Sequence, residues 1–270
     1  MSNKKRRISI ISLFHYFKLV FRSALFISVL VIYIVHRVTD SLPPFGEILK
    51  RPPILAFIWI IFVVEMILRF FPSSHIESMG CQKQFKRNFI PTEETDPGLN
   101  SWRSTLAVAI AWFLLNGVIG VLYYTDIIDA PILIIISLAY SVCDMICILF
   151  FCPFQTWFMK NKCCGSCRIY NWDYAMMFTP LVFIPDPFTW SLLGISLALL
   201  VTWEVLIRVF PERFSERTNH ALSCANCKEK LCHHKVQLRH FLKKNNERLR
   251  LKGNTVIEKA KKHINERRKK

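Results

Sequence analysis

The sequence lacks the short motifs that identify the common enzyme classes. It has no Ser-His-Asp order, no phosphate-binding loop, no H-E-x-x-H and no G-x-G-x-x-G. Hydrolase and nucleotide-binding functions therefore have no support. A small-residue cleavage site is also absent after the basic start, and Lys18 and Arg22 interrupt the first apolar stretch. Both features argue against a cleaved signal peptide.

Charge is nearly absent from several long runs of apolar residues. The chain of 270 residues is 52% hydrophobic and has a mean hydropathy of +0.29. Runs of about 18–22 apolar residues have the length that a helix needs to cross a bilayer. We therefore expect an all-α, polytopic membrane helical bundle of about six spans. The expected spans cover residues 23–36, 54–71, 104–124, 131–151, 168–185 and 188–210, and the amphipathic segment 8–22 can extend the first.

Acidic residues are scarce, 19 against 36 Lys and Arg, which gives a net charge of +17. The excess lies at the two ends. Residues 4–7 read KKRR, and residues 211–270 hold 18 Lys and Arg against 6 Asp and Glu, a net charge of +12. The positive-inside rule then predicts a multi-pass protein of the cell membrane with both termini in the cytoplasm.

The charge distribution predicts two domains, a transmembrane part over residues 1–210 and a basic cytoplasmic tail over residues 211–270. The tail suits anionic lipid headgroups, and a solvated tail is the alternative. Nucleic acid is a weaker candidate partner, because the charge adjoins a span.

The fifth expected span decides this topology. It contains Asp173 and is followed by Pro185-Asp186-Pro187, which predicts a tight turn into the sixth span. A re-entrant hairpin would also return the tail to the cytoplasm. The basic loops over residues 72–103 and 152–167 are expected inside, and the loop over residues 125–130, which lacks Lys and Arg, is expected outside.

Two apolar stretches end in related octapeptides, EMILRFFP and EVLIRVFP. In each, Glu precedes Arg by four residues, which places the two side chains on one helical face. This spacing predicts the ion pairs Glu65–Arg69 and Glu204–Arg208, at helix ends that anchor to lipid phosphates. A duplication of spans one and two as spans five and six is the alternative.

Cysteine is absent from the side that we expect to be external, which disfavours a disulfide framework. Two C-x2-C pairs, Cys164 with Cys167 and Cys224 with Cys227, could supply four thiolates to zinc or to an iron–sulfur cluster on the cytoplasmic face. Further thiols and an imidazole lie beside each pair. The expected metal ligands are Cys152, Cys163, Cys164, Cys167, Cys224, Cys227, Cys232 and His233.

The stretch CILFFCPFQTW, residues 147–157, ends in Cys-Pro-x-x-x-Trp. This ending resembles the Cys-Pro loops of membrane polyferredoxin-type electron-transfer proteins. The resemblance implies redox chemistry and a redox partner protein. The chain lacks the ferredoxin ligand runs of that family, and Cys147 is one residue too far from Cys152 for its usual pair.

Four carboxylates lie within or at the inner ends of the expected spans, namely Glu65, Asp144, Asp173 and Glu204. Carboxylates in lipid are costly and are functional candidates for that reason. For Asp144 and Asp173 the sequence offers no local partner, and Asp144 is flanked by Cys143 and Cys147. A carboxylate beside a thiol fits a metal path or a proton relay.

These observations predict a multi-pass membrane protein with a cytoplasmic-face cysteine metal centre, iron–sulfur or zinc, used in membrane-linked electron transfer. One alternative is a transporter that handles a soft metal ion. Another is a non-enzymatic scaffold or sensor, acylated at cysteines such as Cys163 and Cys164.

Overall fold

A computed structural model describes residues 10–39, 52–75, 79–98, 102–161, 165–223 and 226–227. All of these belong to one unit, which extends to Lys230, and the separate unit from Leu231 to Lys270 lies outside the described residues. The regular structure of the described residues is helical. Pro91 and Asn219 form an isolated antiparallel bridge.

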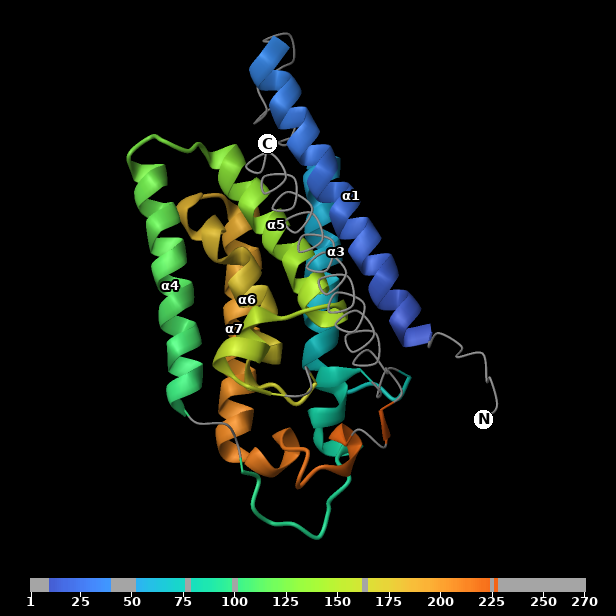
Figure 1. Cartoon of the computed structure of the whole chain (residues 1–270). Coiled ribbons are helices and arrows are strands. Elements are labelled where there is room, and N and C mark those ends of the chain that lie inside the picture. The colour runs from blue at the N-terminus through green and yellow to red at the C-terminus, as the bar shows by residue number, and fades with distance from the viewer. Residues whose placement is uncertain are drawn as a thin grey trace, which may run out of the picture. The chain divides into compact units, whose positions relative to one another are not determined.

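Five long helices form the frame of the unit (Figure 1). They are α1 (Ile10–Thr39), α3 (Pro52–Phe70), α4 (Trp102–Tyr124), α5 (Ala130–Leu149) and α7 (Pro187–Val209). The helices α1, α4, α5 and α7 are long and apolar enough to cross a membrane. Helix α3 has 19 residues and is therefore about 28 Å long. These helices indicate that the chain is a helical membrane protein.

The third, fourth and sixth expected spans correspond to α4, α5 and α7 within two residues at each end. Aspartates define two of the starts. The Asp129 carboxylate accepts the backbone N–H of Ile132 at the start of α5, and Asp186 accepts that of Phe188 at the start of α7. The tight turn predicted before the sixth span is confirmed, because the N–H of Asp186 donates to the carbonyl of Ile184 at 2.9 Å.

Helix α1 begins at Ile10, well before the expected start of the first span, and its 30 residues extend about 45 Å. The amphipathic segment is therefore part of the same helix. Lys18 and Arg22 do not end it, because both side chains reach carboxylates of other helices.

The fifth expected span is not one helix. Three short helices replace it, η4 (Arg168–Trp172), α6 (Asp173–Phe178) and η5 (Thr179–Phe183). Pro180 lies in the last, and a proline interrupts regular helical hydrogen bonding. The 3₁₀ segments rise about 2.0 Å per residue, so these few residues cover about 29 Å.

This broken segment runs along the full length of α4. At its start the guanidinium of Arg168 lies 5.5 Å from the ring centre of Trp102, and at its end the ring of Phe183 packs 5.8 Å from that of Tyr124. The segment therefore passes from one end of the bundle to the other.

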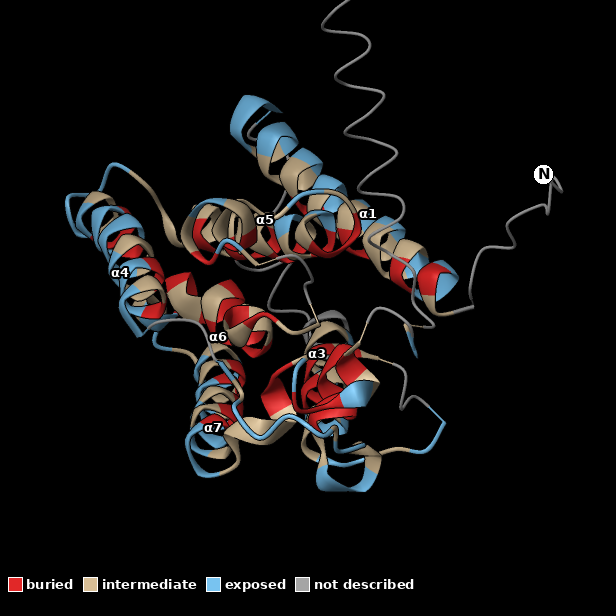
Figure 2. Ribbon diagram, turned by 60° about the horizontal axis from the view of Figure 1, so that its bottom comes forward, coloured by how far each residue is buried: buried red, intermediate tan, exposed pale blue. Residues whose placement is uncertain are grey.

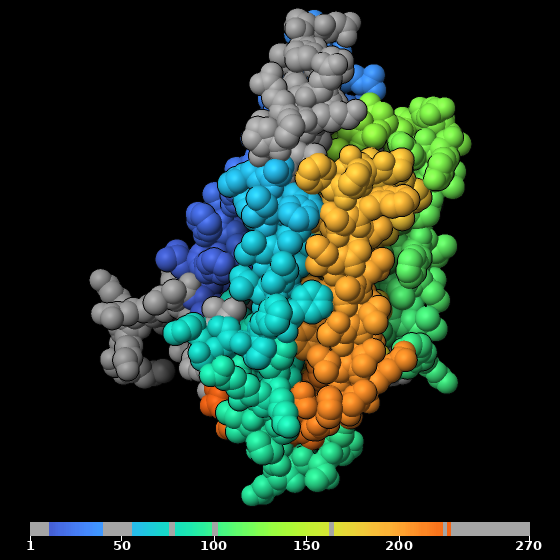
Figure 3. Space-filling model, turned by 180° about the vertical axis from the view of Figure 1, so that it is seen from behind, coloured from blue at the N-terminus to red at the C-terminus, as the bar shows by residue number. Residues whose placement is uncertain are grey.

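The largest core cluster joins α3, α6 and α7, and α3 and α7 lie side by side in Figure 3. Its buried side chains include Phe62, Met66, Tyr174, Leu199 and Trp203. On the outward faces of α1, α4 and α7 the residues are exposed (Figure 2), and they include apolar ones such as Phe17, Phe113 and Val201. Exposed apolar faces on spanning helices suggest contact with the lipid bilayer.

Loops from different parts of the chain gather at the end of the bundle where α3 and α7 finish. The side-chain amide of Asn219 donates to the carbonyl of Lys83 at 3.0 Å, and that of Gln84 donates to Gly165 at 3.1 Å. The two basic loops and the start of the tail thus share one end. The loop between α4 and α5 lies at the other end (Figure 1).

Candidate functional site

A buried arginine of α1 connects three helices. Arg22 has a side chain only 3% exposed, and its guanidinium lies 2.8 Å from Glu65 of α3 and 3.1 Å from Asp144 of α5. Lys18, one turn earlier, lies 3.0 Å from the other oxygen of Glu65. These ion pairs allow two cations and two carboxylates to be buried together.

A second buried pair adjoins the first. Arg69 of α3 donates two hydrogen bonds to Asp173 of α6, at 2.7 and 2.6 Å. The Arg69 guanidinium also lies 4.6 Å from the ring centre of Tyr174, whose hydroxyl donates to Glu65 at 2.7 Å. We call Lys18, Arg22, Glu65, Arg69, Asp144 and Asp173 the α3 charge cluster. Its three cations balance its three carboxylates.

Helix α7 carries a smaller cluster. Glu204 accepts hydrogen bonds from the guanidinium of Arg168 at 2.7 Å and from the indole N–H of Trp172 at 2.8 Å. Arg208 lies 5.4 Å from the ring centre of Trp102, and Arg168 lies 5.5 Å from the same centre. The α7 cluster therefore consists of Glu204, Arg168, Arg208, Trp172 and Trp102.

The ion pairs predicted from the Glu-x-x-x-Arg spacing are wrong. The carboxylate of Glu65 is paired with Lys18 and Arg22, and Arg69 is paired with Asp173. In α7, Glu204 is paired with Arg168 instead of Arg208. Each of these partners comes from a segment distant in the sequence. Helix packing brings the charged group of that segment closer to the side chain than the residue on the next turn of the same helix.

The intramembrane carboxylates without local partners have distant ones. Asp144 is paired with Arg22 and Asp173 with Arg69, so neither carboxylate is an isolated buried charge. The expected anchoring of Arg69 to lipid phosphates is likewise wrong, since its side chain is 14% exposed and bonded to Asp173.

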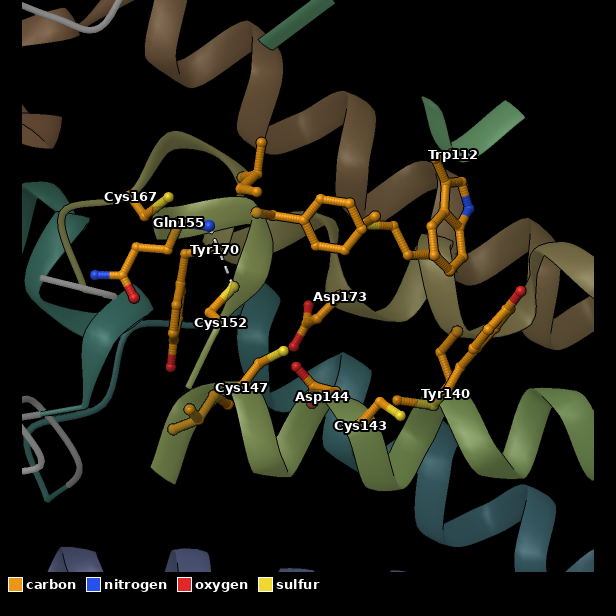
Figure 4. Close-up of a pocket in the computed structure, with 15 residues that line it drawn as sticks. Trp112, Tyr140, Cys143, Asp144, Cys147, Cys152, Gln155, Cys167, Tyr170 and Asp173 are labelled. Atoms are coloured by element: carbon orange, nitrogen blue, oxygen red, sulfur yellow. Dashed lines mark hydrogen bonds between the residues drawn. The ribbon is translucent and has the colours of Figure 1, made fainter. Parts of the chain in front are cut away.

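A cavity of about 130 Å³ adjoins the α3 charge cluster (Figure 4). Its lining combines thiols, thioethers, carboxylates and aromatic rings, and includes no Lys, Arg or His. Those lining residues are Trp112, Tyr140, Cys143, Asp144, Cys147, Ile148, Cys152, Phe154, Gln155, Cys167, Ile169, Tyr170, Asp173, Met176 and Met177. Four of the chain's cysteines and two carboxylates, Asp144 and Asp173, therefore face one space.

Cys147, near the end of α5, and Cys152, just after that helix, both line the cavity, and the backbone N–H of Gln155 donates to the Cys152 sulfur at 3.4 Å. Helix α5 ends at Leu149, and Pro153 then precedes a π-turn over Phe154–Phe158, which returns the chain toward the helix end. In Figure 4 the two cysteines and the two aspartates point into the cavity.

The structure brings together only part of the predicted metal-ligand set. Cys152 and Cys167 line the cavity, and Cys227 is partly buried but does not line it. The other predicted ligands lie outside the described residues, and they are Cys163, Cys164, Cys224, Cys232 and His233. Within the described ranges, no three His, Cys, Asp or Glu side chains are placed to hold a metal ion.

Sequence reasoning missed Cys147 and Arg22 as site residues. Cys147 is not among the expected metal ligands, yet it lines the cavity together with Cys152. Its five-residue spacing from Cys152, across a helix end and before Pro153, is the available sequence signal. Arg22 carries no such signal, because its partners are far along the chain.

Comparisons with models of protein families, with curated proteins and with solved structures found no match to this chain.

Proposed function

We propose that the chain is a multi-pass membrane protein that binds a soft metal ion in the thiol-lined cavity, between Cys147 and Cys152. The placement of these two cysteines in the lining of one cavity, together with Cys143 and Cys167, carries this proposal. Thiolates and thioethers select soft ions such as Cu(I). The thioethers of Met176 and Met177 in the same lining add to that preference.

Two thiolates suffice for a soft monovalent ion, which accepts linear coordination. The cavity therefore does not need the three converged ligands that zinc requires. Each thiol gives up its proton when it binds metal. In the same lining, Asp144 is paired with Arg22 and Asp173 with Arg69, so each carboxylate at the cavity is balanced by its own arginine.

The proposed topology has six spans, with both termini in the cytoplasm of the cell. Support comes from the broken segment, which runs the whole length of α4 as the fifth pass. The end that gathers the loops carries Lys83, Lys86, Arg87 and Lys160, whereas the α4–α5 loop carries only acidic charges. This asymmetry favours the loop-rich end as the cytoplasmic one.

The iron–sulfur or zinc centre predicted from the C-x2-C pairs stays a proposal beside this one. Its support is the sequence of Cys164, Cys224 and their neighbours, and Cys167 would belong to both sites. Electron transfer with a redox partner protein, and contact of the tail with anionic headgroups, are parts of that same proposal. The acylated-scaffold alternative would leave the cavity thiols without a role.

The test is a titration of the anaerobically purified, reduced full chain with Cu(I) against a chromogenic chelator. We expect one Cu(I) per chain, lost in Cys147→Ser and in Cys152→Ser. Cys81→Ala is the matched control, because this buried cysteine lies in the α3–α7 core and does not line the cavity. Iron, zinc and acid-labile sulfide are measured on the same samples.

Two results would overturn the proposal. One is a wild-type chain that leaves all the Cu(I) with the chelator. The other is Cu(I) binding that survives in the Cys147→Ser, Cys152→Ser double variant. Stoichiometric zinc or sulfide that disappears in Cys164→Ser or Cys224→Ser would instead support the centre predicted from the sequence. Metal flux into liposomes then distinguishes a transporter from a resident centre.

A further inference from the structure

A second and larger cavity, of about 300 Å³, lies among the gathered loops. Its lining is mainly polar and basic, unlike that of the thiol-lined cavity. It consists of Gln84, Gly98, Lys160, Asn161, Ser166, Cys167, Arg168, Ile207, Phe214, Ser215, Glu216 and Arg217. We call it the basic cavity. It draws on segments that follow α3, α5 and α7, and so depends on the whole fold of this end.

Three cations line the basic cavity against one carboxylate. Glu216 is that carboxylate, and it accepts a hydrogen bond from the hydroxyl of Ser166 at 2.7 Å. Arg168 is paired with Glu204, but its Nε is buried with no hydrogen-bond partner in the described part of the chain. A buried donor without a partner is costly, and Arg168 carries this cost in the wall of the basic cavity.

The other two cations, Lys160 and Arg217, have charged groups with no ion-pair partner in the described ranges. Donors that are not charged surround them, since Asn161, Ser166 and Ser215 also line the cavity. Cations with hydroxyl and amide donors around one concave space are the groups that bind a phosphate.

Lys160 occupies a backbone conformation that favours glycine. Its φ is +49°, in the left-handed region, two residues after the π-turn that ends at Phe158. Glycine is the usual residue where a helical turn ends in this way. A lysine there sacrifices stability and places a cation at the cavity, which points to a function for its charge.

Gly98 faces the guanidinium of Arg217 at the cavity wall. Gly98 has a φ of +47°, and a Cβ there would lie 2.8 Å from an Nη atom of Arg217. The absence of a side chain at Gly98 therefore leaves room for the Arg217 guanidinium at the cavity wall.

We propose that the basic cavity binds a phosphate ester, held by Lys160, Arg168 and Arg217. The volume exceeds what a bare phosphate fills, so it has room for the alcohol part of the ester. A phospholipid headgroup and a soluble phosphate ester share this chemistry. The proposal does not depend on metal binding in the other cavity.

The test measures binding to the purified full chain in a neutral detergent by the shift of its melting temperature. One arm adds short-chain phosphatidic acid, with phosphatidylcholine as the zwitterionic comparison. The other arm adds glycerol 3-phosphate, with inorganic sulfate as the comparison anion. We expect stabilisation in at least one phosphate-ester arm, with an affinity reduced about tenfold by Lys160→Gly or Arg217→Gln through the loss of a charge-assisted contact.

Lys160→Gly separates binding from folding. The substitution relieves the left-handed strain, so without ligand its melting temperature is expected to equal or exceed that of the wild type. Lys86→Gln is the matched control, since Lys86 is an exposed cation at the same end outside the cavity. Its phosphate-ester binding should be unchanged.

Stabilisation by phosphatidic acid alone identifies a lipid headgroup, and stabilisation also by glycerol 3-phosphate identifies a soluble ester as a ligand. Either result supports the site when Lys160→Gly weakens it and Lys86→Gln does not. No stabilisation in either arm would overturn the proposal. An equal loss in all three variants would do so too, because it would show only general attraction of anions to a basic surface.

Discussion

Helices α3 and α7 end in related octapeptides, and their glutamates have closely similar surroundings. Glu65 accepts from Arg22 and from the hydroxyl of Tyr174, and Glu204 accepts from an arginine and from the indole of Trp172. In both cases a guanidinium and an aromatic donor come from other segments. The arginines of the two octapeptides differ, however, because Arg69 is bonded to Asp173 whereas Arg208 is exposed on the ring of Trp102.

This difference follows from what each helix faces. The end of α3 faces α1, α5 and α6, which together bring two carboxylates and two further cations into the interior. The end of α7 faces α4 and η4, which provide two tryptophan rings and one arginine. The same octapeptide pattern is thus part of the buried α3 charge cluster, beside the thiol-lined cavity, and of the half-exposed α7 cluster, beside the basic cavity.

The largest loss of stability among variants of the two helix ends is expected from Arg22→Met. The substitution leaves Asp144 without its cation and Glu65 with only Lys18, so the free energy of unfolding should fall by about 3–5 kcal/mol. Unfolding by a denaturing detergent measures it. Adding Asp144→Asn should recover part of the loss, and an unchanged stability of Arg22→Met would show that the α3 charge cluster is not formed.

A smaller effect is expected from Arg69→Lys. Lysine keeps the charge but loses the two-point contact with Asp173 and the stacking on Tyr174, at a cost of about 1.5–3 kcal/mol. The same unfolding titration measures it. The cost of Arg69→Lys should exceed that of Arg208→Met in α7. A smaller cost would contradict the assignment of Arg69 as the buried one of the two octapeptide arginines.

The smallest effect is expected from Arg208→Met at the matching position of α7. This exposed arginine loses only its contact with the Trp102 ring, worth about 0.5–1 kcal/mol. Tryptophan fluorescence and the unfolding titration together report the change. A loss as large as that of Arg69→Lys would mean that the two helix ends are equivalent, as a duplicated unit requires.

The apolar spans could be predicted from the sequence because long uncharged runs, bounded by Asp129 and Asp186, leave few alternatives for α5 and α7. The start of α1 could not, because Lys18 and Arg22 interrupt the pattern and are accepted only through ion pairs with other helices. The broken fifth segment was predicted as a single pass, and its Pro180 alone does not specify where each short helix ends.

The candidate site was predictable only in its chemistry. The abundance of cysteine and the intramembrane carboxylates indicated soft-ligand chemistry, and Cys152, Cys167, Asp144 and Asp173 do line one cavity. The ion-pair partners were not predictable, since Arg22 and Asp144 are 122 residues apart. Local spacing favours the next turn of a helix, and packing between helices overrides that preference.

The most direct test of the central claim is the X-ray absorption spectrum of the full chain loaded with Cu(I). We predict a first shell of sulfur alone in the wild type, and no retained copper after Cys147→Ser with Cys152→Ser. A first shell of nitrogen or oxygen, or a sulfur shell that survives this double substitution, would contradict the assignment of these two thiols as the metal-binding pair.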